Sequence, residues 1–294
     1  MIRWPARAFT VIALLLVGAF SACSSEDAAP PSLPITESTL ARGKVIAEGF
    51  GSCGFCHAGQ GAPGQSLAGG RVFVDFYGEV QPSNITRSST GIGGWSEQDL
   101  RKIFRANTRP DGSLLYSPLH RGFEWMSESD VTAVAVYVRS LAGVDNTVER
   151  REPSFINRNV FGFFMTKSEV QGYVPQISPS FKTEYGQYVV DNIARCAVCH
   201  SKPGGLLDVG DYLGGGQEIS INGVTKIAPN ITSSKSSGIG SWSVEQLRHF
   251  LMTGSTADGK KIDSSFCPVE FYRNAPSDEI EAVVSYLRSV AAIE

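Results

Sequence analysis

The stretch Cys53-Gly54-Phe55-Cys56-His57 decides how the rest of this chain is interpreted. It places two thiols three residues apart and an imidazole directly after the second thiol, which is the attachment pattern of a c-type haem. Each thiol can add to a haem vinyl group to form a thioether, and the histidine that follows is then placed to ligate the iron. We therefore expect Cys53 and Cys56 to hold a haem covalently and His57 to be its first axial ligand.

The same pattern returns as Cys196-Ala197-Val198-Cys199-His200. Two other interpretations exist for such a motif, namely a dithiol redox pair and half of a zinc site. A zinc site would have to combine cysteines from segments about 140 residues apart, with nothing near either motif to complete the set. The repetition favours two covalently bound haem c groups, with Cys196, Cys199 and His200 serving the second.

Length and composition allow this interpretation. The chain has 294 residues, enough for two domains of ordinary size, and 42% of them are hydrophobic. Glycine accounts for 31 of the 294 residues, which is more than its usual share of about 7%. This abundance suits long loops that wrap closely around flat cofactors. The net charge is −3, and no basic excess suggests nucleic acid as a partner.

The first 23 residues have the pattern of a targeting segment. Arg3 and Arg7 precede an apolar run from Phe9 to Ala19, which is too short to be a lasting membrane span. The segment ends at Cys23 in a pattern that resembles a bacterial lipoprotein cleavage site, so we expect a lipid anchor there and a flexible tether over 24–36. An ordinary secretory signal is the alternative, and either route delivers the chain to the periplasmic side of the membrane.

An internal repeat spans the body of the chain. The haem motifs are 143 residues apart, and several blocks after the first recur after the second at an offset of 146 to 149 residues: Asn84-Ile85-Thr86 and Asn230-Ile231-Thr232, Gly91–Ser96 and Gly238–Ser243, Asp111-Gly112 and Asp258-Gly259, and Tyr137–Ser140 and Tyr286–Ser289. The repeat predicts two copies of one haem domain, at 37–145 and 181–294, with an inter-domain strap at 146–180.

The pattern within each copy predicts an all-α fold with long glycine-rich loops. A short helix precedes each haem motif (39–49 and 182–192), and its glycine could let another helix approach closely. A second helix begins after Ser96 or Ser243 as N-cap. A last helix covers 128–141 and 278–291, the first with Ser127 and Asp130 as an acidic capping box. No strand pattern competes with these helices.

Taken in order, these motifs resemble the multihaem cytochrome c subunits of membrane-bound alcohol, aldehyde and sugar dehydrogenases. The resemblance covers nearly all of residues 37–294, and the Gly-Ile-Gly-x-Trp-Ser block is its most specific part after the haem motifs. It implies two tandem class I cytochrome c domains and an electron-transfer role. Those relatives often carry three haem domains, whereas this chain has two motifs.

The resemblance also implies a sixth iron ligand, usually a methionine about 19 residues before the tyrosine of the last helix. In the second copy that position is Cys267, followed by a proline. Cys267 could ligate the second haem, in which case a thiolate would lower its potential. It could instead be a small buried hydrophobic residue without iron contact. A partner thiol or another ligand is the remaining alternative.

The corresponding position of the first copy is Pro118, which cannot ligate iron. The nearest donors are His120 and Met126. His120 lies in a loop and is the better-placed donor, whereas Met126 directly precedes a helix cap, where it could pack on Val131 as a hydrophobic staple. Both remain candidates for the sixth ligand of the first haem.

We therefore expect a diheme cytochrome c that relays single electrons between a periplasmic or membrane dehydrogenase and a downstream cytochrome or oxidase. The alternative is a sulfur-compound oxidoreductase, because a haem with histidine and cysteine ligands also resembles the catalytic haem of thiosulfate dehydrogenases. A haem-based sensor is a third possibility, but no signalling domain supports it.

Overall fold

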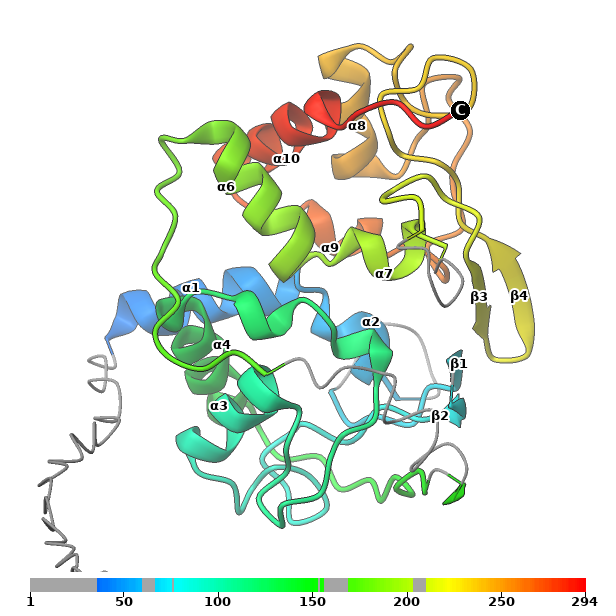
Figure 1. Cartoon of the computed structure of the whole chain (residues 1–294). Helices are drawn as coiled ribbons and strands as arrows, with labels where there is room; N and C mark the ends of the chain where they lie inside the picture. Colours follow the sequence, from blue (N-terminus) through cyan, green and yellow to red (C-terminus); the bar gives the residue numbers. More distant parts are fainter. Residues whose placement is uncertain (1–35, 60–66, 76, 153, 156–168, 203–209) are drawn as a thin grey trace, which may run out of the picture. The chain divides into compact units, whose positions relative to one another are not determined.

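A computed structural model describes residues 36–59, 67–75, 77–152, 154–155, 169–202 and 210–294 (Figure 1). All of these lie in one structural unit, Ser32–Glu294. The predicted leader, Cys23 and nearly all of the tether fall outside the described ranges, as do residues 156–168 of the strap. Within the described part, no helix is both long and apolar enough to cross a membrane.

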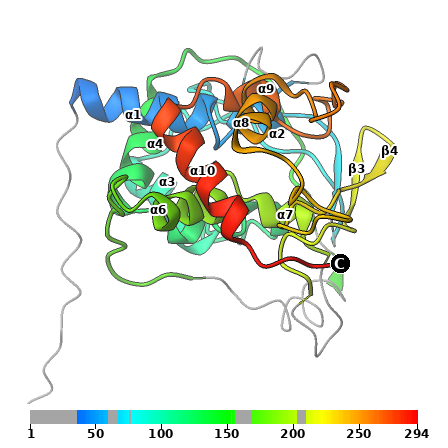
Figure 2. The ribbon, with the colours of Figure 1, turned by 90° about the horizontal axis from the view of Figure 1, so that it is seen from above.

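Two crossed helix pairs form the main framework. Helix α1 (Glu37–Glu48) packs on α4 (Glu128–Ser140), and α6 (Lys182–Tyr188), which continues as a π-helical segment over Val189–Ile193, packs on α10 (Ser277–Ser289) (Figures 1 and 2). These four elements occupy equivalent positions in the repeat and fall close to the helices that the sequence predicts.

A glycine permits each of these crossings. A Cβ atom added to Gly43 would lie 2.0 Å from the carbonyl oxygen of Ala133, and one added to Gly186 would lie 2.0 Å from that of Ala282. Any side chain at these positions would force the helices apart. The prediction that a glycine allows close approach of a second helix is confirmed in both copies.

Shorter elements carry the haem motifs and the loops around them. The motifs form the short helices α2 (Cys53–His57) and α7 (Cys196–His200). The others are helices α3 (Glu97–Ala106), α8 (Val244–Thr253) and α9 (Val269–Tyr272), and the 3-10 turns Pro118–His120 and Phe123–Trp125.

The predicted caps are present, with one difference. Ser96 and Ser243 cap α3 and α8 in full reciprocal capping boxes. Ser127 caps α4 by accepting a hydrogen bond from the backbone N–H of Asp130, but the Asp130 carboxylate does not return the bond. It is instead paired with Arg42, because a buried carboxylate is better stabilised by a guanidinium than by one backbone N–H.

The expectation of an all-α fold without strands is wrong in one respect. A small antiparallel sheet has the strand order β2-β1-β3-β4, with β1 at Phe73–Asp75, β2 at Gly78–Val80, β3 at Glu218–Ile221 and β4 at Val224–Ile227. The strands are only three or four residues long, too short for a clear alternation. Their best signal is the pair Asn222-Gly223, whose φ angles of 49° and 77° form the tight turn between β3 and β4.

The sheet also joins the two copies, because β1 belongs to the first and β3 to the second. Phe73 is paired with Ile221 and Val74 with Ser220. The described residues therefore place the two copies in direct backbone contact rather than leaving the strap as their sole connection.

A buried polar network makes a second connection between the copies. Arg42 of α1 forms ion pairs with Asp130 of α4 and with Glu279 of α10, and the two carboxylates are 1% and 4% exposed. Tyr188 donates to Asp130 at 2.7 Å, and Tyr185 donates to Glu279 at 2.7 Å. Asp130 and Glu279 are equivalent positions in the repeat, so the network brings matching carboxylates to one shared cation.

Candidate haem-binding sites

Each haem motif begins directly after a residue in the left-handed region. Ser52 (φ 41°) precedes α2 and Arg195 (φ 53°) precedes α7. Such conformations are uncommon for residues with a Cβ atom, so they mark a sharp entry into each motif helix. The four motif thiols are partly exposed, and none of the five described cysteines forms a disulfide, which leaves them able to form thioethers.

The two motif histidines are oriented in the same way. Nδ1 of His57 lies 2.7 Å from the carbonyl oxygen of Ser83, and Nδ1 of His200 lies 2.8 Å from that of Pro229. A carbonyl oxygen can only accept, so Nδ1 carries the proton and donates, and Nε2 is left with its lone pair for a metal. Burial lowers the pKa of both rings, which keeps them neutral as iron ligands require.

These carbonyls are positioned by the Asn-Ile-Thr repeats. Asn84 follows Ser83, and its side-chain oxygen accepts hydrogen bonds from the backbone N–H and hydroxyl of Thr86. Asn230 follows Pro229 and binds Thr232 in the same way. The repeat was visible in the sequence, but its role in orienting the histidines emerges only from the structure.

The His120 ring lies close to the His57 ring. The centroids of the two rings are 6.2 Å apart, with 68° between the ring planes. Two imidazoles on opposite sides of one metal ion should have centroids about 6 Å apart, because each metal–nitrogen bond is about 2 Å long and each centroid lies about 1 Å beyond the nitrogen. The spacing therefore fits a pair of axial ligands.

The surroundings of His120 support the same fit. Its Nδ1 is buried and has no hydrogen-bond partner among the described residues, which is unusual for a polar atom. Burial, followed by the nearby charge of Arg195, holds the pKa of His120 well below its ordinary value, so the ring is neutral. Met126 differs: its side chain is fully buried in the hydrophobic core next to the α4 cap.

Cys267 lies close to the second haem motif. It is near enough that a thiolate at Cys199 would raise the pKa of Cys267, and a thiolate at Cys267 would raise the pKa of Cys196. Tyr272 of α9 forms a hydrogen bond with the Cys267 side chain, and burial raises the pKa of this thiol to about 12. Cys267 also packs against the hydrophobic core cluster. Its position near the second motif is consistent with iron ligation, and its core contact is consistent with a packing role.

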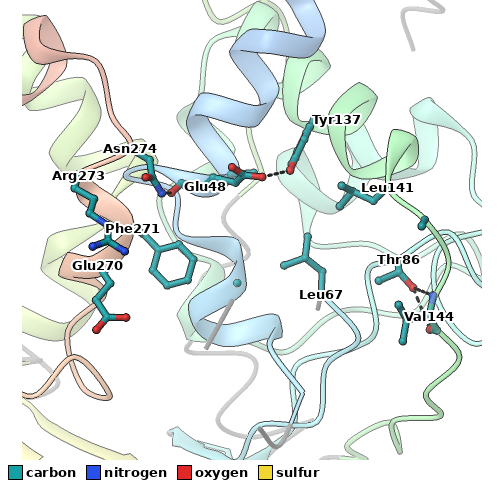
Figure 3. A pocket seen from close by; sticks show the side chains of 13 residues that line it. Glu48, Leu67, Thr86, Tyr137, Leu141, Val144, Glu270, Phe271, Arg273 and Asn274 are labelled. Carbon is teal, nitrogen blue, oxygen red and sulfur yellow. Dashed lines mark hydrogen bonds between the residues drawn. The ribbon is translucent and has the colours of Figure 1, made fainter. Parts of the chain in front are cut away.

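A cavity of about 540 Å³ lies beside the first motif (Figure 3). Gly54, between the two thioether cysteines, forms part of its wall, together with Glu48 and Tyr137, whose hydroxyl donates to the Glu48 carboxylate. Phe271 and Arg273 line it from the second copy. Among the described residues its lining includes neither His57 nor His120.

Comparison with known proteins identifies cytochrome relatives of this chain. The chain is 31% identical over 297 residues to the fructose dehydrogenase cytochrome subunit of Gluconobacter japonicus, and the alignment covers 98% of this chain and 59% of the relative. It is 28% identical to a diheme cytochrome c-type of Cereibacter sphaeroides, covering 83% of each chain. It is 25% identical to the cytochrome c subunit of a quinone alcohol dehydrogenase of Gluconobacter oxydans, covering 95% of this chain and 59% of the relative.

This chain is a homologue of c-type cytochromes. The resemblance to cytochrome subunits of dehydrogenases is thereby confirmed, and it implies an α-rich cytochrome fold with covalently bound haem c. The chain spans about three fifths of the length of the two dehydrogenase subunits. No family model matches the chain.

Proposed function

We propose that this cytochrome homologue binds two haem c groups covalently, one through Cys53 and Cys56 and the other through Cys196 and Cys199. His57 and His200 are the first axial ligands, because each offers Nε2 while a backbone carbonyl fixes Nδ1. The single observation that carries this proposal is this duplicated geometry: the same motif, the same left-handed entry and the same carbonyl contact occur twice.

The proposed sixth ligands are His120 for the first haem and Cys267 for the second. The ring spacing of 6.2 Å supports His120 over Met126, whose side chain belongs to the core. The proximity of Cys267 to Cys196 and Cys199 supports its placement beside the second haem. Copies at 37–145 and 181–294, joined by the strap, form the two haem domains.

We assign the chain a relay of single electrons. When bound, each haem supplies one-electron chemistry at its iron, and the chain provides the ligands, the spacing and the exclusion of water. Arg71 donates to the Phe55 carbonyl oxygen inside the first motif and to the carbonyl oxygen of Ser265, two residues before Cys267, so the two proposed sites lie close together. This proximity supports transfer between the two haems.

The proposed partners follow from the relatives. Two of them are named as cytochrome subunits of dehydrogenases, which supports a dehydrogenase as electron donor to this chain. The acceptor is a downstream cytochrome or oxidase. The periplasmic side of a membrane, with an anchor at Cys23, is the proposed location.

Haem content tests the core of this proposal. The mature protein is denatured, and its mass and haem absorption are measured after the polypeptide is separated from free haem. We expect two covalently retained groups, one in a Cys53→Ala/Cys56→Ala variant and one in a Cys196→Ala/Cys199→Ala variant. Denatured wild-type protein without retained porphyrin would contradict the proposal.

A sulfur-compound oxidoreductase is the second candidate, and Cys267 is the feature that favours it. The thiol is hydrogen-bonded by Tyr272 close to the second motif, where a reacting sulfur compound could meet it. Purified protein is incubated with thiosulfate or tetrathionate and an artificial electron carrier. Turnover that disappears in Cys267→Ala would support an enzyme, and its absence in wild-type protein supports the electron relay.

A further inference from the structure

The loops that carry the two proposed sixth ligands are each held by an arginine from the other copy. In the first loop, the Arg195 side chain donates a hydrogen bond to the carbonyl oxygen of Leu119, the residue before His120. Its guanidinium carbon lies 3.7 Å from the centroid of the Phe123 ring, three residues after His120. Arg195 itself directly precedes Cys196, so it connects the second haem motif to the ligand loop of the first haem.

The loop backbone near this contact lies very close to Arg195 and to the residues before it. A Cβ atom on Gly122 would lie 2.4 Å from the Asp191 carbonyl oxygen and 3.1 Å from Cγ of Arg195. The side-chain amide of Asn192 donates to the carbonyl oxygen of Gly122 at 3.1 Å. The loop therefore lies close against the end of the π-helical segment, at the residues that directly lead to Arg195.

Arg71 makes the reciprocal contact. It is 4% exposed, donates to the Phe55 carbonyl oxygen at 2.6 Å and also donates to the carbonyl oxygen of Ser265. Phe55 lies inside the first haem motif, and Ser265 lies two residues before Cys267. The guanidinium also stacks on the Phe55 ring, with its carbon 4.5 Å from the ring centroid.

The guanidinium groups of Arg71 and Arg195 donate their hydrogen bonds to backbone carbonyl oxygens. Neither Arg71 nor Arg195 has a carboxylate within ion-pair distance in the described ranges, and Nε of Arg195 is buried without a partner there. Buried arginines usually pair with acidic groups, since a buried charge is costly without compensation. A guanidinium placed instead on a loop carbonyl fixes the position of that loop through a charge-assisted hydrogen bond.

We propose that Arg71 and Arg195 are positioning residues, each of which holds the sixth-ligand loop of the haem bound by the other copy. The two haem sites are thereby interdependent: the first motif supports the Cys267 loop, and the residue before the second motif supports the His120 loop. This inference rests on the proposed ligands, so its test includes a variant of the ligand itself.

The test measures the electron paramagnetic resonance spectrum of the oxidised protein, in which each haem has its own signal. In Arg195→Gln we expect loss of most of the low-spin signal of the first haem, with the second unchanged. In Arg71→Gln we expect the opposite. Arg139, an exposed residue of α4, provides the control, and Arg139→Gln should leave both signals as in the wild type.

Lysine variants separate positioning from charge. Arg195→Lys can still donate to the Leu119 carbonyl, so it should retain the first haem signal. Arg71→Lys cannot span the Phe55 and Ser265 carbonyls together, so it should perturb the second haem as much as Arg71→Gln. Lysine variants also keep the buried positive charge. They therefore replace a glutamine variant in the test if that variant does not accumulate as folded protein.

The outcomes distinguish this inference from the proposed function. If His120→Ala leaves the first haem signal unchanged, the ligand assignment fails. If His120→Ala removes that signal but Arg195→Gln does not, the positioning role is overturned. It is also overturned if both arginine variants weaken both signals equally, because that would indicate general loss of structure.

Discussion

At the scale of single residues, the two proposed haem sites share their first ligand and differ in their second. His57 and His200 are fixed by equivalent carbonyl contacts, whereas the proposed sixth ligands are His120 in one copy and Cys267 in the other. Axial ligands are a main determinant of haem potential. A chain with these ligand pairs would therefore hold two haems of different redox potential despite the internal repeat.

His120 and Met126 can be separated by substitution. We expect His120→Ala to replace the bis-histidine low-spin spectrum of the first haem by a high-spin one, because the ring facing His57 is removed. Met126→Leu should leave that spectrum unchanged and lower the unfolding free energy by less than about 1.5 kcal/mol, as a volume-conserving core substitution does. Near-infrared magnetic circular dichroism of the oxidised protein reports both results, and a methionine charge-transfer band lost in Met126→Leu would contradict the assignment.

Cys267 leads to a separate prediction. A thiolate stabilises ferric iron, so Cys267→Met should raise the potential of the second haem and leave the first unchanged. Cys267→Ala should abolish the thiolate-type ferric signal. Spectroelectrochemical titration and electron paramagnetic resonance measure these effects, and unchanged spectra in both variants would show that Cys267 is only a packing residue.

At the scale of elements, the helix crossings depend on glycine. We expect Gly43→Ala to lower the unfolding free energy by about 2–3 kcal/mol, because its Cβ would overlap the Ala133 carbonyl and overpacked sites relax incompletely. Gly94 is the matched control, since a Cβ there meets nothing within 4 Å and its substitution should cost less than about 0.5 kcal/mol. Urea unfolding measures the difference, and equal costs at the two positions would contradict the crossing argument.

Prediction from sequence succeeded for elements whose signals are local. Ser96 and Ser243 cap helices because the bonds they make lie within three residues. The bounds of the first and last helix of each copy differ from prediction by only one or two residues, once the π-helical segment is counted with α6. The strands were missed because each is short, and Asn222-Gly223 was the available signal. The pairing of the Asp130 carboxylate with Arg42 and Tyr188, in place of the helix cap, could not be predicted, nor could the contacts of Arg195. Both depend on residues more than 50 positions away in the sequence.

At the scale of the whole molecule, Arg42 compensates two buried carboxylates from different copies. We expect Arg42→Ala to lower the unfolding free energy by about 3 kcal/mol or more, since Asp130 and Glu279 would remain buried without their cation. The control is Lys182→Ala, which removes an exposed ion pair with Glu281 and should cost at most about 1 kcal/mol. Thermal unfolding of both variants at pH 7 provides the comparison, and similar midpoints would contradict the role of the network.

The pairing of β1 with β3 has a consequence for how this protein can be divided. If the chain were cut within the strap, each fragment would present an unpaired strand edge. The second fragment would also lose the cation that compensates Glu279, whereas the first would keep the pair of Arg42 and Asp130. Such fragments should aggregate when produced alone and recover a common structure when produced together. Gene fission between the two haem motifs would therefore yield an obligate heterodimer rather than two autonomous monohaem proteins.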